Sequence, residues 1–151
     1  MTHRSIARIA ASTVAAVVAL AAFAPRPAHH PAPPAVHTVR MVMDGAIGKF
    51  EPSTITIHPG DQVRFVNVSG GPHNVSFDPA TLPQGGQQLL EAAMADQIQP
   101  LWGKLIERNG ESYTISFAGA RPGRYPFFCT PHMYDRNGHM TTGMKGVIVV
   151  R

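Results

Sequence analysis

Residues 125–132 read YPFFCTPH and contain the only cysteine of the chain, Cys129, with His132 three positions later. The segment before Cys129 is typical of a strand, and the Thr-Pro pair after it predicts a loop. Upstream, residues 71–74 read GPHN and place His73 at the start of another strand-like segment. Because a β-sandwich can bring the ends of two such strands together, we expect these three side chains to meet.

One thiolate and two imidazoles form a recognisable metal-ligand set. With a thioether as a weak and long fourth ligand, this set suits copper, which can be both Cu(I) and Cu(II) in it. Zinc prefers a stronger fourth ligand. A single cysteine also excludes an internal disulfide and a four-cysteine zinc or iron–sulfur site within the chain. The alternative for Cys129 is a small buried side chain without chemistry.

Composition predicts one small all-β domain. The chain has 151 residues, of which 14 are Gly and 14 are Pro, too many for a mostly helical protein because both residue types weaken helix interiors. Strand-like segments recur between turn residues. We expect about seven strands, at Val36–Met43, Thr54–His58, Gln62–Val68, Asn74–Phe77, Ser112–Phe117, Gly123–Cys129 and Lys145–Val150. That number is usual for a small β-sandwich.

Two segments between these strands carry further local predictions. Pro59-Gly60-Asp61 has the composition of a turn and predicts a hairpin-like unit between the second and third strands. Within Gln87–Trp102, apolar residues recur at helical spacing, so we expect a short inserted helix that packs on the sandwich. Segments 78–86 and 107–110 are expected to be surface loops.

The N-terminus predicts export. In residues 1–24, basic side chains precede an apolar run from Ile9 to Ala24, which is short for a membrane span and indicates a signal peptide. An uncleaved anchor is the alternative, and the protein is expected at a membrane only in that case. Residues 25–36 form a Pro-rich spacer, and residues 37–151 form the folded domain. We therefore expect a periplasmic or otherwise extracytoplasmic protein.

Charge gives no indication of nucleic-acid binding. The formal net charge is +4, and it falls to +2 when Arg4 and Arg8 are removed with the signal peptide. No cluster of Lys and Arg follows. No nucleophile-elbow motif indicates a hydrolase.

Three segments together resemble the small blue copper proteins, or cupredoxins, in particular the plastocyanin and pseudoazurin branch. They read GDQVRFVN at 60–67, GPHNVSFD at 71–78 and YPFFCTPH at 125–132, and the resemblance extends over about residues 37–151. It implies a Greek-key β-sandwich with one type 1 copper ion. The equatorial copper ligands that it implies are His73, Cys129 and His132, and Asn74 would help to hold the two ligand loops together.

The fourth, axial ligand is a methionine in this branch, but eleven residues separate His132 from Met144, more than the branch has. Met133 and Met140 also lie within reach along the sequence, and His139 is a competing donor. We select Met144 because GMKG at residues 143–146 resembles the passage from the ligand loop into the last strand of the family. Met140 is the main alternative.

Other residues of ligand type are expected to have ordinary roles. His29 and His30 lie in the spacer and are expected to be solvated. His58, before Pro59, is not expected to bind metal. Met41 and Met43 lie on one strand and are expected to belong to the core.

The resemblance implies an electron carrier and not an enzyme. It implies redox protein partners that dock near His132, the ligand nearest the surface, with the long loop Met133–Gly143 reshaping the docking face. A copper oxidase or nitrite reductase is not expected, because Phe128 and Thr130 flank Cys129 where multicopper relatives have histidines. We expect a monomer that binds neither nucleic acid nor a substrate. The alternative is a copper chaperone or storage protein, which Met133 and Met140 near the site and His29 and His30 in the spacer favour.

Overall fold

The computed structural model describes residues 33–133 and 143–151. The predicted signal peptide, most of the predicted spacer, and the alternative donors His139 and Met140 therefore lie outside the described residues. The described part contains eight strands, one α-helix and two short 3-10 helices. The prediction of an all-β fold with one short inserted helix is confirmed. None of the helices in this part is long and apolar enough to cross a membrane.

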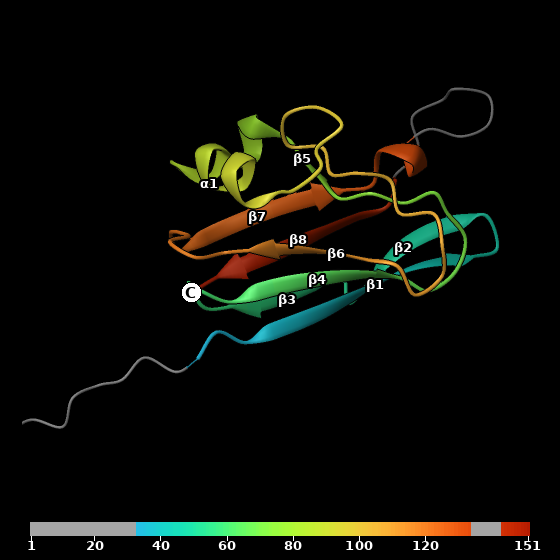
Figure 1. Cartoon of the computed structure of the whole chain (residues 1–151), viewed down its shortest axis with the longest axis horizontal. Coiled ribbons are helices and arrows are strands. Elements are labelled where there is room, and N and C mark those ends of the chain that lie inside the picture. The colour runs from blue at the N-terminus through green and yellow to red at the C-terminus, as the bar shows by residue number, and fades with distance from the viewer. Residues whose placement is uncertain (1–32, 134–142) are drawn as a thin grey trace, which may run out of the picture. The chain divides into compact units, whose positions relative to one another are not determined.

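The strands form two four-stranded sheets (Figure 1). The first sheet contains, in spatial order, β2 (Ile47–Glu51), β1 (Val36–Asp44), β4 (Gln62–Asn67) and β6 (Ser112–Ser116). The second contains β3 (Thr54–Ile57), β8 (Lys145–Val150), β7 (Gly123–Phe128) and β5 (Ser76–Phe77). The chain passes repeatedly between the sheets, so the Greek-key β-sandwich is confirmed.

The predicted hairpin-like unit around Pro59 is wrong. β3 and β4 follow each other in sequence but belong to different sheets, because β3 pairs in parallel with β8 and β4 pairs with β1 and β6. The turn between them therefore crosses from one sheet to the other. The Asp61 carboxylate holds it in place by accepting hydrogen bonds from the backbone N–H groups of His58 and Ala35, both at 2.9 Å.

The eighth strand, β2, was not predicted. It follows the turn at Asp44-Gly45, where Gly45 has a φ of 60°, and it pairs antiparallel with β1 so that Met43 lies opposite Gly48. The Asp-Gly pair is a common hairpin signal. Phe50 is the residue that fixes β2 on the core, because its side chain is buried between the sheets.

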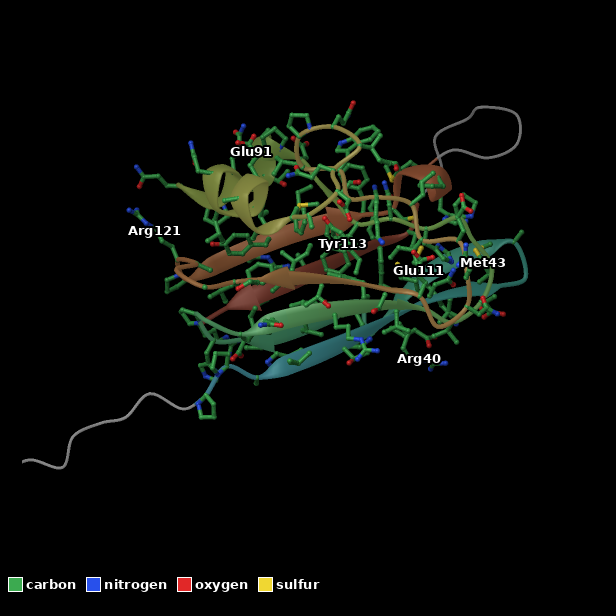
Figure 2. The ribbon with its side chains drawn as sticks, viewed as in Figure 1. Arg40, Met43, Glu91, Glu111, Tyr113 and Arg121 are labelled. Carbon is green, nitrogen blue, oxygen red and sulfur yellow. The ribbon has the colours of Figure 1, made fainter. Side chains whose placement is uncertain are left out.

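The inserted helix α1 (Gly86–Ala93) is shorter than the segment in which it was expected. Met94 is already extended, and positive φ angles at Asp96 and Leu101 prevent the helix from continuing. Ile98, one of the apolar residues at helical spacing in the segment predicted to be a helix, is consequently 57% exposed. Beyond the helix, the Tyr113 hydroxyl donates a hydrogen bond to the carbonyl of Ala95 and ties this segment to β6. Figure 2 labels Tyr113 among the side chains of the sandwich. The 3-10 helix η1 (Pro79–Thr81) lies within the expected loop 78–86.

Aromatic side chains from both sheets join in the core. Phe50 and Phe65 extend from the first sheet and Phe127 from the second, and their rings contact edge to face at centroid distances of 4.7–6.0 Å. Burial of each such side chain contributes about 1.5–3 kcal/mol. The packed sheets therefore form a rigid support for the loops at their ends.

The segments that carry the predicted ligands leave the sandwich at one end. β4 ends at Asn67 before the loop to His73, β7 ends at Phe128 before Cys129, and β8 begins at Lys145 opposite Phe128. The 3-10 helix η2 (Thr130–His132) follows Cys129 directly. Residues that are 56 positions apart in sequence are thus brought to one place by the strand pairing.

Candidate metal centre

His73, Cys129 and His132 converge at this end of the sandwich. The Cys129 Sγ lies 3.3 Å from Nδ1 of His132 and 3.9 Å from Nδ1 of His73, and the ligand atoms of the three residues all lie within 4.8 Å of one another. His73 and Cys129 are fully buried, whereas His132 is partly exposed. The convergence expected from the sequence is present.

The surroundings of His73 fix which of its ring nitrogens is available. The residue makes a two-way backbone bridge with Ile106, at 2.9 and 2.7 Å, which anchors its loop. Its Nε2 lies 3.0 Å from the carbonyl oxygen of Ser69. A carbonyl only accepts hydrogen bonds, so Nε2 carries the proton and Nδ1 presents its lone pair toward Cys129.

Cys129 is held by both neighbouring loops. Its backbone N–H donates to the carbonyl of Met144 at 2.9 Å, and its sulfur accepts a hydrogen bond from the backbone N–H of Asn74 at 3.4 Å. Burial raises the pKa of the thiol to about 11, although the hydrogen bonds from Asn74 and His132 act in the opposite direction. A metal ion must therefore displace a proton from this sulfur in order to bind.

Asn74 links the two ligand loops, as the sequence predicted. Its Oδ1 accepts a hydrogen bond from the backbone N–H of Thr130 at 2.8 Å, and its Nδ2 donates to the carbonyl of Gly103 at 3.4 Å. Its side chain is fully buried. The segments that contain His73 and Cys129 are therefore tied together by one amide side chain as well as by the sulfur contact.

The two imidazoles are suited to metal binding at neutral pH. Their ring centroids lie 4.8 Å apart with the planes tilted by 37°. Burial lowers the pKa of His73, and burial together with the nearby His73 lowers the pKa of His132. Both rings are therefore neutral at neutral pH, which is the form that binds metals.

Met144 lies beside His132. Its side chain is 1% exposed, and a Cβ atom placed on Gly48 would lie 3.2 Å from the Met144 sulfur and 3.1 Å from Cγ of His132. Both side chains therefore reach the same point of β2. The sulfur of Met133 instead lies against Gly143.

The spacing of the donor atoms fits a metal ion with short nitrogen and sulfur bonds. Bonds of about 2.0 Å to nitrogen and about 2.3 Å to sulfur separate the two donor atoms by about 3.5–3.7 Å in tetrahedral or trigonal geometry. The two observed sulfur–nitrogen distances, 3.3 and 3.9 Å, lie on either side of this range. A soft thiolate with two imidazoles is a donor set that copper accepts in both oxidation states.

Comparison with known proteins decides the family. The model of a family described as copper binding proteins, plastocyanin/azurin family, matches residues 37–151. This chain is a member of that family, and copper is its cofactor. Plastocyanin from Scenedesmus fuscus is 36% identical over 114 residues, which cover 76% of this chain and 98% of that protein. Plastocyanin from Nostoc punctiforme is 34% identical over 116 residues, which cover 76% of this chain and 73% of that protein.

A solved structure agrees with this assignment. The oxidised form of plastocyanin from the fern Dryopteris crassirhizoma has 30% sequence identity and a TM-score of 0.57, covering 76% of this chain and 99% of that one. The predicted resemblance to cupredoxins of the plastocyanin type is thereby confirmed. Because plastocyanins are electron carriers, these relatives support an electron carrier rather than an enzyme.

Of the remaining candidates from the sequence, His29 and His30 lie outside the described residues, whereas His58 and Met41 have the ordinary roles that were expected for them. The His58 side chain is 83% exposed, and it lies at the opposite end of β3 from the metal centre. Met41 is fully buried in the core as expected, whereas Met43 is only half-buried and lies outside the core cluster, so the prediction for Met43 is wrong. The sequence reasoning missed Ser69 and Gly48, which contact the candidate ligands. The hairpin signal at Asp44-Gly45 could have predicted β2, but it does not show that Gly48 lies against the candidate ligands.

Proposed function

We propose that this protein is an extracytoplasmic type 1 copper protein that carries single electrons between redox protein partners. The observation that carries the proposal is the approach of the Nδ1 atoms of His73 and His132 to the Cys129 sulfur, which brings together a donor set that suits copper. His73, Cys129 and His132 would hold the copper as equatorial ligands, and Met144 would be the axial ligand. When bound, copper supplies a one-electron redox couple.

The chain contributes rigidity and exclusion of water. His73 and Cys129 are fully buried, and Asn74 bonds both ligand loops. Ligands fixed in this way change little between the two oxidation states, which favours fast electron transfer. Hydrogen bonding from Asn74 to the sulfur and the buried thioether of Met144 would adjust the reduction potential.

The docking face is proposed to surround His132. Ile47, 71% exposed, precedes the Gly48 that contacts the His132 ring, and Leu105, 40% exposed, precedes the Ile106 that pairs with His73. Exposed apolar side chains next to residues that contact the ligands favour contact with a protein partner. The loop Met133–Gly143, most of which lies outside the described residues, is proposed to shape this face as well.

Absorption spectroscopy and electron exchange test the proposal. Stoichiometric Cu(II) added to the purified mature protein should produce an intense visible band from sulfur-to-copper charge transfer. The band should disappear on reduction and return on oxidation through many cycles with one copper retained. If the protein instead gives a colourless complex and surrenders Cu(I) to a competing chelator within one cycle, it is a copper chaperone or storage protein. Sequencing the N-terminus of the exported protein tests the cleavage of residues 1–24.

A further inference from the structure

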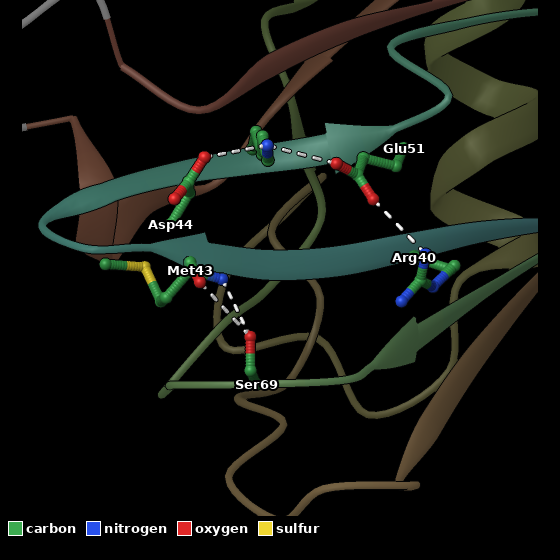
Figure 3. Close-up of polar contacts among 6 residues, drawn as sticks. Arg40, Met43, Asp44, Glu51 and Ser69 are labelled. Carbon is green, nitrogen blue, oxygen red and sulfur yellow. Dashed lines mark hydrogen bonds and ion pairs between the residues drawn. The ribbon is translucent and has the colours of Figure 1, made fainter.

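The tip of the β1–β2 hairpin, residues 43–48, contacts both candidate ligand loops. It belongs to the first sheet, whereas Cys129 and Met144 flank strands of the second. On one side the tip contacts Ser69, which precedes His73 in the same loop. On the other side it contacts His132 and Met144. Figure 3 shows the tip and its contact with Ser69.

The contact with Ser69 consists of two hydrogen bonds to one residue. The backbone N–H of Met43 donates to the Ser69 hydroxyl at 3.0 Å, and this hydroxyl donates to the Met43 carbonyl at 3.4 Å. The Ser69 carbonyl accepts the hydrogen bond from Nε2 of His73 at 3.0 Å. Ser69 thus connects β1 to the imidazole ring, with its hydroxyl bonded to Met43 and its carbonyl bonded to His73.

The neighbouring Gly70 keeps this loop close to the strand. It has a φ of 75°, and a Cβ atom on it would collide with the Met43 side chain. A side chain at this position would therefore push the loop away from β1 and break the bonds of Ser69 to Met43. The hydrogen bonds and the close packing hold Ser69 in a single position.

The second contact depends on the lack of a side chain at Gly48. Its φ lies outside the left-handed region, so the backbone conformation does not require glycine here. A Cβ atom would lie 3.1–3.3 Å from the His132 ring and the Met144 sulfur, closer than ordinary van der Waals contact. The absence of a side chain thus lets β2 lie directly against two candidate ligands.

Met43 and Gly48 lie opposite each other in the pairing of β1 with β2. The contact with Ser69 and the contact with His132 and Met144 are therefore made by one pair of opposite residues of the hairpin, which we call the rung. On its outer side this hairpin carries the ion pairs of Lys49 with Asp44 at 3.1 Å and with Glu51 at 3.2 Å (Figure 3). Because the rung is part of a sheet, movement of one ligand loop relative to the other must deform it.

We propose that Ser69 and Gly48 are positioning residues, through which the hairpin tip sets the placement of His73 relative to His132 and Met144. This inference rests on the copper centre proposed above. The tip holds the His73 ring through the Ser69 clasp, by which we mean the two hydrogen bonds between Ser69 and Met43 and the bond from His73 to the Ser69 carbonyl. Through Gly48 it limits the space next to His132 and Met144. It thereby keeps the ligand geometry the same for both oxidation states of copper.

Ser69→Ala tests the clasp. Loss of a group that orients a ligand typically weakens metal affinity about 10- to 100-fold, and we expect a loss of this size for Cu(II). Cu(I) depends more on the sulfur ligands, so its affinity should fall less. Each tenfold difference between the two losses raises the reduction potential by about 59 mV. Ser69→Thr keeps the hydroxyl and should restore the wild-type affinity and potential.

Ser116→Ala is the matched control for Ser69→Ala. The Ser116 hydroxyl also accepts a backbone hydrogen bond, from Ala118 at 3.3 Å, but Ser116 pairs with Gln62 at the end of the sandwich away from the ligands. Its removal should leave the potential and the copper absorption unchanged. If Ser69→Ala lowers the melting temperature of the apo-protein but leaves the potential and spectrum of the copper form at wild-type values, the hydrogen bonds of Ser69 are only structural and Ser69 is not a positioning residue.

Gly48→Ala tests the second contact. The added methyl group must displace the Met144 sulfur or the His132 ring by a few tenths of an ångström, so the energy of the copper–sulfur band and the electron paramagnetic resonance of the Cu(II) form should change. Gly86→Ala introduces a similarly crowded methyl group, at 3.2–3.3 Å from Tyr125, Leu82 and Pro83, but on α1. It should leave both signals unchanged.

The outcomes separate this inference from the proposed function. If wild-type protein shows no sulfur-to-copper band, the copper centre itself is wrong. If the wild-type band is present and both Ser69→Ala and Gly48→Ala keep the wild-type potential and spectrum, the copper centre stands and the positioning role is overturned.

Discussion

The two ends of the sandwich differ in what their buried polar groups interact with. At one end, Asp61 accepts hydrogen bonds from the backbone of Ala35 and His58 and pairs with Nε2 of His37 at 2.8 Å. At the other end, His73, Cys129 and His132 direct their ligand atoms toward one another. The first cluster satisfies its own groups and stabilises the fold. In the second cluster, the ligand atoms are arranged to bind a metal cation.

The pKa values at the two ends show the same contrast. The hydrogen bonds from His58 and Ala35 and the pairing with His37 lower the pKa of Asp61 to about 2, so its charged form is favoured. Burial raises the pKa of Cys129 to about 11 and lowers that of both site histidines, so their neutral forms are favoured. The cluster around Asp61 therefore stabilises a charged side chain of the protein. The side chains of the metal centre are uncharged without metal, and the positive charge there comes from the bound ion.

The largest expected effect is that of Cys129→Ser. A hydroxyl is a poor ligand for copper in place of a thiolate, so the intense visible band should be lost entirely. The fold should persist, because serine is close to cysteine in size and all other core residues are unchanged. Absorption and circular dichroism spectra of the Cu(II)-treated variant check this. Retention of the intense band in the serine variant would show that copper binds elsewhere.

Asn74→Ala should have the next largest effect. It removes the acceptor of the Thr130 N–H and the link between the ligand loops, so Cu(II) affinity should fall about 10- to 100-fold. A competition titration with a coloured chelator measures the loss. Asn109→Ala, on an exposed loop, is the control and should keep wild-type affinity. Equal affinities for the two variants would contradict the role of Asn74.

Asp61→Asn should affect stability and leave the metal centre unchanged. An amide cannot replace all the hydrogen bonds of a buried carboxylate, so the free energy of unfolding should fall by about 2 kcal/mol. Urea unfolding of the apo-protein measures the loss, and the copper spectrum should stay at its wild-type position. A shifted copper spectrum would show that the two ends are coupled.

The smallest expected effect is the dependence of stability on acidic pH. Because the folded protein lowers the pKa of Asp61 from 3.8 to about 2, the stabilisation from its charge is complete above pH 3.8 and is lost as the pH falls toward 2. The difference in unfolding free energy between wild type and Asp61→Asn should therefore shrink over this interval. A constant difference between pH 5 and pH 2 would show that the charge of Asp61 does not contribute.

Much of the fold was predictable because strands and turns have local sequence patterns. The turn residues and the alternating strands predicted a β-sandwich, and seven of the eight strands overlap the expected segments. Sheet membership was not predictable at Pro59-Gly60-Asp61, because a turn composition does not show whether the chain returns to the same sheet. The helix was overestimated because apolar spacing continued past Met94, where the backbone is extended.

The candidate ligands were predictable because cysteine and histidine are rare and their motif is specific. His73, Cys129 and His132 could therefore be identified without knowledge of their neighbours. Ser69 and Gly48 could not, because serine and glycine are common and their role depends on the pairing of β1 with β2. The choice of Met144 over Met140 remains a proposal, supported by the contact of Met144 with the same point of Gly48 as His132.

A crystal structure of the copper-loaded protein, with anomalous diffraction measured at the copper edge, tests the central claim most directly. We predict one copper ion bonded to the Cys129 sulfur and to Nδ1 of both His73 and His132, with the Met144 sulfur at a longer distance. An anomalous peak elsewhere, for example at the spacer histidines, or a copper ion not bonded to Cys129, would contradict the account.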